Sequence, residues 1–289
     1  MSFGPILVTG AAGQLGTFIV DAFAGRTLVP LTRHDLDIAD PEAVRRVLAD
    51  AEPRVIINCA AFNDVDGAED APVAALDANA FAVRSLARAA EACGATLVHF
   101  SSDFVFDGTA SDAYDEDAAP APRGTYAASK LLGEWFALSV PGAFVLRVES
   151  LFGCADGWSG RRGTLDGIVA SLRGGREQAV LVDRVVSPSY LPDVAAATRH
   201  LVESGAPAGL YHCVNTGQAT WQEVAAEAAR VLGVTPRLRA VRMDQITMRA
   251  IRPRFCALSN RKLAAAGFQM PTWQDALRRW LGTPASATT

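Results

Sequence analysis

The sequence predicts an α/β fold: a Rossmann-type, doubly wound parallel sheet with a smaller, interleaved α/β lobe. Three observations support this prediction. Short apolar runs alternate with segments of helical periodicity through the first half of the chain. A glycine-rich turn, Gly10 to Gly16, follows the first apolar run. Proline and glycine fall where the expected helices begin and end. Strands that alternate with helices favour right-handed βαβ units and a parallel sheet.

The first half is expected to contain five strands, over residues 6–9, 27–31, 54–58, 96–101 and 143–147. Four helices are expected between them, over 14–23, 41–50, 72–93 and 125–139. Asp40 can cap the second helix, because Pro41 and Glu42 then occupy its first turn. Gly94 stands where a left-handed residue ends the third helix.

The second half is less regular. We expect helices over 164–172, from about Pro192, from the Thr220–Glu223 capping box to 232, and over 272–281, with strands over 180–182 and 209–213. Residues 1–151 are expected to form a dinucleotide-binding domain, to which residues 176–204 return. Residues 152–175 and 205–289 are then expected to form the smaller, substrate-binding lobe.

Composition excludes several classes of function. The 289 residues are 50% hydrophobic and 20% charged, as in ordinary globular proteins, and the net charge of -4 argues against binding to nucleic acid or an anionic membrane. No apolar run approaches the ~20 residues of a membrane helix, and the N-terminus lacks a signal-peptide pattern. The five scattered cysteines, four in apolar stretches, indicate buried free thiols and a cytoplasmic location. Neither they nor the four histidines have metal-ligand spacing, so we predict no metal.

The glycine turn has the context that dinucleotide binding requires, with an apolar strand before it and an amphipathic helix after it. Gly10 would allow the tight turn, Gly13 the approach of a pyrophosphate to the backbone, and Gly16 close packing of helix on strand. The spacing is GxxGxxG rather than GxGxxG. A tight turn without a ligand is the alternative.

The residues after the second strand bear on the choice of cofactor. Arg33 favours the 2′-phosphate of NADPH, whereas the nearby Asp35 leaves NADH open. Asp37 is placed either to accept a hydrogen bond from the adenine amino group or to form a turn before the helix. Ala60 and Ala61 are small, as a chain beside a cofactor requires.

Tyr126 and Lys130 are four residues apart on an expected helix and therefore share a face. The lysine ammonium would stabilise the phenolate, so that Tyr126 can exchange a proton with a substrate oxygen. Ser101 and Ser102 end the strand that precedes this helix, and a hydroxyl there can orient a substrate carbonyl. Alone, a YxxxK pair is a common accident; with the glycine turn and this hydroxyl it indicates nicotinamide-dependent chemistry.

The chain resembles the dTDP-4-dehydrorhamnose reductase family of the extended short-chain dehydrogenase/reductase superfamily. The resemblance runs nearly end to end and rests on the following stretches: TGAAGQLG (9–16), SSDFVFDG (101–108), YAASKLLGE (126–134), LR (146–147), LFG (151–153), SPSYLPD (187–193), GLYH (209–212), TW (220–221) and RP (252–253). It implies a catalytic set of Ser102, Tyr126 and Lys130, with Asp103 and Phe104 near the sugar. The implied reaction is NAD(P)H-dependent reduction of a nucleotide-linked 4-keto-6-deoxyhexose, most simply dTDP-4-dehydro-L-rhamnose to dTDP-L-rhamnose.

One departure from the family pattern concerns the sugar. The family commonly reads Arg-Thr-Ser-Trp where this chain has Arg147-Val148-Glu149-Ser150, so a tryptophan that contacts the sugar is missing. Glu149 is either a new polar group of the pocket or a strand-end residue. The 154–162 segment, with Arg161, is expected to supply substrate contacts instead, because arginine suits a diphosphate; solvated loop arginines are the alternative.

These considerations give the following expected site. The cofactor contacts are Gly10, Gly13, Gln14, Leu15, Gly16, Arg33, Asp37, Ala60, Ala61, Tyr126 and Lys130, and the substrate contacts are Asp103, Phe104, Glu149, Ser150 and Arg161. NADPH is the preferred cofactor and NADH the alternative. A nucleotide sugar is the expected partner, with a homodimer open.

Two other functions stay open. One is an epimerase or dehydratase that retains its NAD, against which Arg33 argues. The other is a non-catalytic regulatory subunit that resembles the beta subunit of methionine adenosyltransferase, which also lacks the tryptophan.

Overall fold

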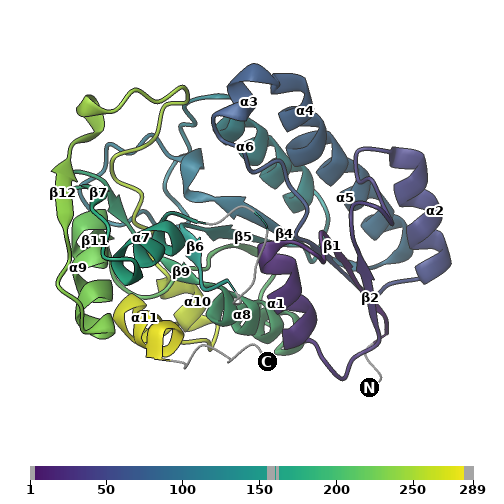
Figure 1. Cartoon of the computed structure of the whole chain (residues 1–289). Helices are drawn as coiled ribbons and strands as arrows, with labels where there is room; N and C mark the ends of the chain where they lie inside the picture. Colours follow the sequence, from purple (N-terminus) through teal and green to yellow (C-terminus); the bar gives the residue numbers. More distant parts are fainter. Residues whose placement is uncertain (1–3, 155–159, 161–162, 283–289) are drawn as a thin grey trace.

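A six-stranded parallel sheet forms the centre of the computed structural model, which describes residues 4–154, 160 and 163–282 (Figure 1). From edge to edge its strands are β10 (Gly209–His212), β5 (Phe144–Val148), β4 (Thr96–Ser102), β3 (Val55–Asn58), β1 (Ile6–Thr9) and β2 (Leu28–Leu31). The order reverses direction at β1, which pairs with both β2 and β3. The predicted α/β fold with a parallel sheet is confirmed.

Helices cover both faces of the sheet (Figure 1). On one face lie α1 (Gln14–Ala22) and α8 (Leu191–Glu203), and on the other lie α2 (Pro41–Ala51), α5 (Ala82–Cys93) and α6 (Thr125–Leu138). The strand β1 shows why. Ile6 and Val8 belong to the core under α1 and α8, whereas Leu7 belongs to the core under α2 and α5. A strand buried on both faces reads as a continuous apolar run.

The expected helix over 72–93 is interrupted. It consists of α4 (Pro72–Leu76), a π-helical turn (Asp77–Phe81) and α5. Asn79 in the π turn bonds both backbone groups of Phe62 and the hydroxyl of Ser129 on α6. Single π turns occur frequently at functional sites. Here the turn fixes the chain after β3 against the catalytic helix.

The smaller lobe has its own apolar core. It contains α7 (Thr164–Arg173), α9 (Trp221–Leu232) and α11 (Trp273–Gly282), and β7 (Gln178–Leu181) pairs in parallel with β12 (Leu238–Val241). Short pairs join β6 (Leu151–Phe152) to β9 (Ser189–Tyr190) and β8 (Val185–Val186) to β11 (Ala219–Thr220). The remaining short helices are α3 (Gly67–Asp70), α10 (Arg261–Ala265) and the 3-10 turns Asp103–Val105 and Met243–Gln245.

Strand pairing bears on the expected division of the chain. Strand β10, from the expected smaller-lobe residues 205–289, lies in the large sheet beside β5. Within residues 176–204, which are expected to return to the large domain, α8 packs on the large sheet and β7 pairs with β12. A strand's own sequence does not specify its partner. The division into cofactor and substrate lobes stays a prediction.

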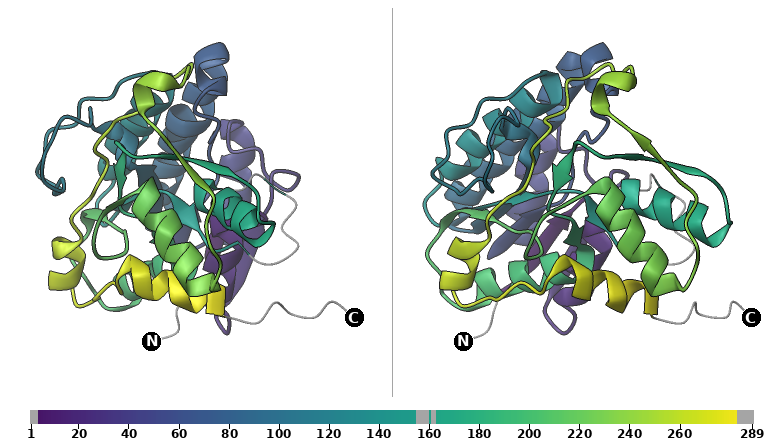
Figure 2. Two further views of the ribbon diagram at one scale, coloured as in Figure 1. Left: turned by 60° about the vertical axis from the view of Figure 1, so that its left-hand side comes forward. Right: turned by 90° about the vertical axis from the view of Figure 1, so that its left-hand side faces the viewer.

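A segment after β12 also links the two lobes. In both views of Figure 2 it runs from the smaller lobe toward the helices beside α3. Arg252 donates both terminal nitrogens to Asp66, at 2.9 and 2.6 Å, and Arg249 pairs with Asp70. These ion pairs hold the segment beside the open end of the sheet.

Burial agrees only partly with the interpretation of the cysteines as buried thiols. Cys213 and Cys256 are buried, Cys59 and Cys154 are partly buried, and Cys93 at the end of α5 is exposed. None of the helices in the described part of the chain is long and apolar enough to cross a membrane.

Candidate active site

The site lies at the carboxyl ends of β1 and β3, where the strand order reverses. Such switch points in parallel sheets open a crevice for ligands. Gly10 ends β1 in a left-handed conformation, with φ of +65°. A Cβ atom there would lie 2.7 Å from the backbone nitrogen of Ala60, beyond β3. Only glycine fits this turn between the two strands.

Gly16 brings α1 onto the turn, as predicted. A Cβ on Gly16 would lie 2.1 Å from the carbonyl oxygen of Gly10. Gly13 is the N-cap residue of α1, so the unpaired N–H groups of the first helical turn face the crevice. The arrangement suits an anion such as a pyrophosphate.

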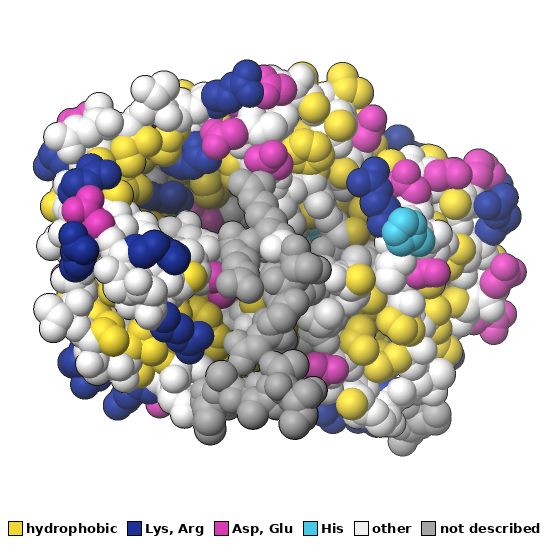
Figure 3. All heavy atoms as spheres, viewed as in Figure 1, with side chains coloured by type: hydrophobic (Ala, Val, Ile, Leu, Met, Phe, Trp, Pro, Cys, Tyr) yellow, Lys and Arg dark blue, Asp and Glu magenta, His cyan; other side chains and the backbone are white. Residues whose placement is uncertain are grey.

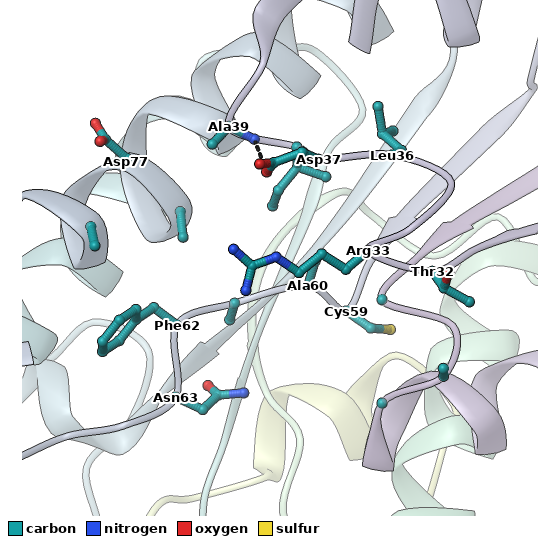
Figure 4. Close-up of a pocket in the computed structure, with 17 residues that line it drawn as sticks. Thr32, Arg33, Leu36, Asp37, Ala39, Cys59, Ala60, Phe62, Asn63 and Asp77 are labelled. Atoms are coloured by element: carbon teal, nitrogen blue, oxygen red, sulfur yellow. Dashed lines mark hydrogen bonds between the residues drawn. The ribbon is translucent and has the colours of Figure 1, made fainter. Parts of the chain in front are cut away.

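A first pocket of about 550 Å³ opens beside this turn (Figure 4). Of the expected cofactor residues, its lining includes Gly10, Gly13, Arg33, Asp37, Ala60 and Ala61. The side chain of Arg33 reaches from the loop after β2 into the pocket (Figure 4). Its guanidinium can bond a phosphate group through two nitrogens.

The two acids beside Arg33 are engaged locally. Asp35 accepts bonds from the backbone nitrogen and the hydroxyl of Thr32, at 2.8 and 2.7 Å, and these bonds lower its pKa. Asp37 accepts from the backbone nitrogen of Ala39 at 3.0 Å, so it forms the turn that the sequence suggested, and it also lines the pocket (Figure 4). Arg33 is therefore the one cationic side chain among the described residues that line this pocket.

A second pocket of about 480 Å³ continues the first. The two share Gly13, Cys59, Ala60, Ala61 and Asn63. Of the other expected site residues, the second pocket is lined by Gln14, Leu15, Ser102, Asp103, Phe104, Tyr126, Lys130 and Ser150. The groove thus joins the expected cofactor end to the expected catalytic set.

Tyr126 and Lys130 occupy successive turns of one face of α6. The Lys130 ammonium is buried and donates to the carbonyl oxygen of Phe100 on β4 at 2.6 Å. Burial lowers the pKa of Lys130 to about 8, and the charge of Glu134 opposes the shift. The Tyr126 ring packs edge-on against Phe104, with centroids 5.5 Å apart. The Lys130 ammonium is thus anchored to β4, on the face of α6 that also carries Tyr126.

Ser102 ends β4 and bonds to Asp103. Its hydroxyl donates to Asp103 Oδ1 at 2.8 Å and accepts from the backbone nitrogen of Phe104 at 3.2 Å. The Asp103 carboxyl is buried, and burial raises its pKa, while the charge of Arg184 opposes the shift. Its second oxygen, Oδ2, has no hydrogen-bond partner within the described structure.

Glu149 lies behind Asp103 rather than in the groove. It is 2% exposed and is not among the lining residues, whereas Val148 and Ser150 on either side are. The expected direct contact of Glu149 with substrate is therefore not supported by its position. The carboxylate oxygens of Glu149 and Asp103 and the sulfur of Cys256 lie within 4.8 Å of one another.

Arg184 supplies the positive charge of this cluster. Its Nη2 is 3.5 Å from the Cys256 sulfur, and its guanidinium lies over the Phe104 ring, 5.5 Å from the centroid. Its charge interacts with those of Asp103 and Glu149 and so supplies the positive charge that a metal ion could otherwise bring. The absence of a bound metal stays our prediction.

Several lining residues were not predicted from the sequence. Arg184, Trp221 and Arg252 all line the second pocket and come from the second half of the chain. The arginines stand in irregular segments without periodicity, and Trp221 was interpreted as a packing residue. The expected contact Arg161 lies outside the described residues.

Comparisons with known proteins agree with one another. The RmlD substrate binding domain family matches residues 4–285. The chain is 36% identical to a dTDP-4-dehydrorhamnose reductase from Mycobacterium tuberculosis, covering 98% of this chain and 94% of that protein. It is 36% identical to a dTDP-4-keto-6-deoxy-D-glucose reductase from Streptomyces niveus, covering 94% of each. A crystal structure of dTDP-4-dehydrorhamnose reductase from Bacillus anthracis in complex with NADP superposes with a TM-score of 0.90, at 31% identity, covering 96% of this chain and 98% of that one.

Proposed function

Since the chain belongs to the RmlD family, which includes the dTDP-4-dehydrorhamnose reductases, we propose that it reduces the C4 carbonyl of a dTDP-linked 4-keto-6-deoxyhexose with NADPH. The observation that carries the proposal is the shared groove. One end holds the glycine turn and Arg33, and the other holds Ser102, Tyr126 and Lys130.

The residues present fit a nicotinamide dinucleotide. Gly10 and Gly13 leave the backbone bare at the helix N-terminus, and Arg33 reaches the place where a 2′-phosphate is bound in this fold. The NADP complex of the relative from B. anthracis supports the same choice. When bound, the cofactor supplies hydride to the sugar carbon.

The chain's own groups complete the reduction. Tyr126 donates its phenolic proton to the carbonyl oxygen as that oxygen gains charge. The Lys130 ammonium, held by the Phe100 carbonyl, stabilises the phenolate that Tyr126 becomes. The Ser102 hydroxyl donates a hydrogen bond to the same substrate oxygen.

The other residues of the second pocket suit a nucleotide sugar. Arg184 and Arg252 place cationic side chains in the pocket wall, where the diphosphate can lie. In the face shown in Figure 3, arginine side chains are numerous around β7 and β12. Asp103, Phe104 and Ser150 are the residues that we propose to face the sugar.

The direct test is a product assay. The protein is incubated with NADPH and, separately, with dTDP-4-dehydro-L-rhamnose and dTDP-4-keto-6-deoxy-D-glucose, and the deoxysugar nucleotide formed is identified by NMR. We expect a 4-hydroxy product from at least one, with the first favoured. NADPH binding without any product would contradict the proposal and leave the regulatory alternative. A tightly retained, redox-cycled NAD would indicate the epimerase or dehydratase.

The cellular location and the assembly of the protein remain predictions. A cytoplasmic location is expected from the free cysteines and from the supply of NADPH. The expected ligand is a nucleotide-sugar substrate, and assembly into a homodimer stays open.

A further inference from the structure

We propose that Glu149 is a positioning residue that shares one proton with Asp103 and so controls how firmly Asp103 holds the hydroxyl of Ser102. The inference rests on the proposed reductase activity, because the other partner of Ser102 is the substrate carbonyl. It assigns a role to a side chain that does not touch the groove.

Two unpartnered oxygens carry the inference. Asp103 Oδ2 and Glu149 Oε1 are both buried, and neither accepts a regular hydrogen bond among the described residues; the one donor close to the Asp103 carboxyl there is the Cys256 thiol, which is a weak donor. The two carboxyl groups have oxygens within 4.8 Å of each other. Two carboxylates cannot bond to each other, because each is only an acceptor. A single proton between them gives both oxygens a partner.

The charge balance favours the same state. The groups that face this pair are Arg184, from the loop between β7 and β8, and Cys256, from the segment after β12. Arg184 is the one cation among them, and burial holds the Cys256 thiol in its neutral form by raising its pKa. One guanidinium balances one negative charge, not two. Burial, together with the charge of Asp103, raises the pKa of Glu149 well above its usual range, and burial also raises the pKa of Asp103, so the pair retains a proton.

The other Glu149 oxygen is fixed. Oε2 accepts from the backbone nitrogen of Ser187 at 2.5 Å, and the Glu149 backbone nitrogen donates to the Ser189 hydroxyl at 3.3 Å. These bonds hold the carboxyl group so that Oε1 faces the cluster. The orientation of the Glu149 carboxyl group is thus set by hydrogen bonds to the backbone and to Ser189.

The consequence concerns the single hydrogen of Ser102. In the structure that hydrogen is donated to Asp103 Oδ1, whereas catalysis requires it at the substrate oxygen. Hydrogen bonds to an ionised acceptor are roughly twice as strong as neutral ones. A proton shared on Oδ2 withdraws charge from Oδ1, so that the Ser102 hydrogen can turn to the substrate.

Glu149→Gln tests the role, because glutamine keeps the shape and a donor but cannot transfer a proton. We expect kcat to fall about tenfold, the scale of one charge-assisted hydrogen bond, with KM for the sugar nucleotide within about twofold of wild type. Glu116→Gln is the matched control: burial also raises the pKa of Glu116, but its carboxylate accepts from the backbone nitrogen of His212 at 2.8 Å and is not part of the Asp103 cluster. Unchanged kcat in Glu149→Gln, or a loss confined to KM or to thermal stability, would overturn the role.

Infrared spectroscopy tests the proton without substrate. We expect the wild-type protein at neutral pH to show a protonated-carboxyl band that shifts on 13C-carboxyl labelling of glutamate and is lost in Glu149→Gln but not in Glu116→Gln. Labelling assigns the band to glutamate even if the Glu149 variant does not fold. No such band in wild type would overturn the shared proton. If the protein reduces no sugar nucleotide, the proposed function is wrong. The infrared band still shows, independently, whether Glu149 and Asp103 share a proton.

Discussion

Arg147 on β5 and Glu134 on α6 form a buried, bidentate ion pair. Arg147 Nε donates to Glu134 Oε1 at 2.8 Å and Nη2 to Oε2 at 2.7 Å, and both side chains are 2% exposed. Glu134 lies one turn after Lys130, so the pair fastens the catalytic helix to the sheet.

Breaking this pair should destabilise the fold. Glu134→Gln leaves the Arg147 charge buried without its counter-ion, and we expect the free energy of unfolding to fall by about 3–5 kcal/mol. Urea unfolding measures the change. The exposed pair Arg230–Glu227 is the control, where Glu227→Gln should cost about 1 kcal/mol or less. Equal losses of unfolding free energy in the two variants would show that the buried pair contributes no more to stability than the exposed one.

Gly16→Ala should damage both stability and cofactor binding. The new methyl group would meet the Gly10 carbonyl oxygen and push α1 away from the turn, so we expect a loss of about 1–3 kcal/mol in unfolding free energy and weaker binding of NADPH. Gly167→Ala in α7 is the matched control, because its Cβ meets nothing within 4 Å, and it should stabilise by up to about 1 kcal/mol. A Gly16→Ala protein that binds NADPH as wild type would contradict the assigned packing.

Arg33→Ala should separate the two cofactors. It removes the cation proposed for the 2′-phosphate, so we expect KM for NADPH to rise about 10- to 100-fold, while KM for NADH stays nearly constant. Steady-state kinetics with both cofactors gives the comparison, and Arg45→Ala on the exposed face of α2 serves as the control. An equal rise of KM for both cofactors would show that Arg33 does not bind the 2′-phosphate.

Lys130 gives activity and stability opposite dependences on pH. Its ammonium form dominates below its pKa of about 8, so kcat/KM should fall as the pH rises through this value. The unfolded chain, with a lysine pKa of 10.5, binds more protons between about 8 and 10.5. Lys130 therefore makes the free energy of unfolding rise with pH in that window. A kcat/KM profile that is flat through this range, with unfolding measured in parallel, would contradict the role of the ammonium.

The sequence predicted the first half of the fold well because its signals are local. The apolar run of β1, the glycines after it and the Tyr126/Lys130 pair act over a few residues, and each lies where it was expected. The partner of β10 and the lining by Arg184 and Arg252 depend on chain segments far apart in sequence, so no local pattern contains them.

Glu149 is an intermediate case. The groove is lined by Val148 and Ser150 but not by Glu149, which lies between them. Strand β5 ends at Val148 and Ser150 is left-handed, with φ of +44°, so the regular alternation of a strand does not extend to these residues and could not have placed Glu149. The role of this departure from the family pattern stays a proposal.

The central claim is that Tyr126 is the proton donor of an NADPH-dependent 4-ketoreductase. The most direct measurement is NADPH consumption by wild type and Tyr126→Phe with dTDP-4-dehydro-L-rhamnose, with NADPH affinity determined for both proteins by fluorescence titration. We expect wild-type turnover on the order of 1 per second or faster, and a variant that binds NADPH normally but loses most of its turnover. Equal turnover in the two proteins would contradict the account.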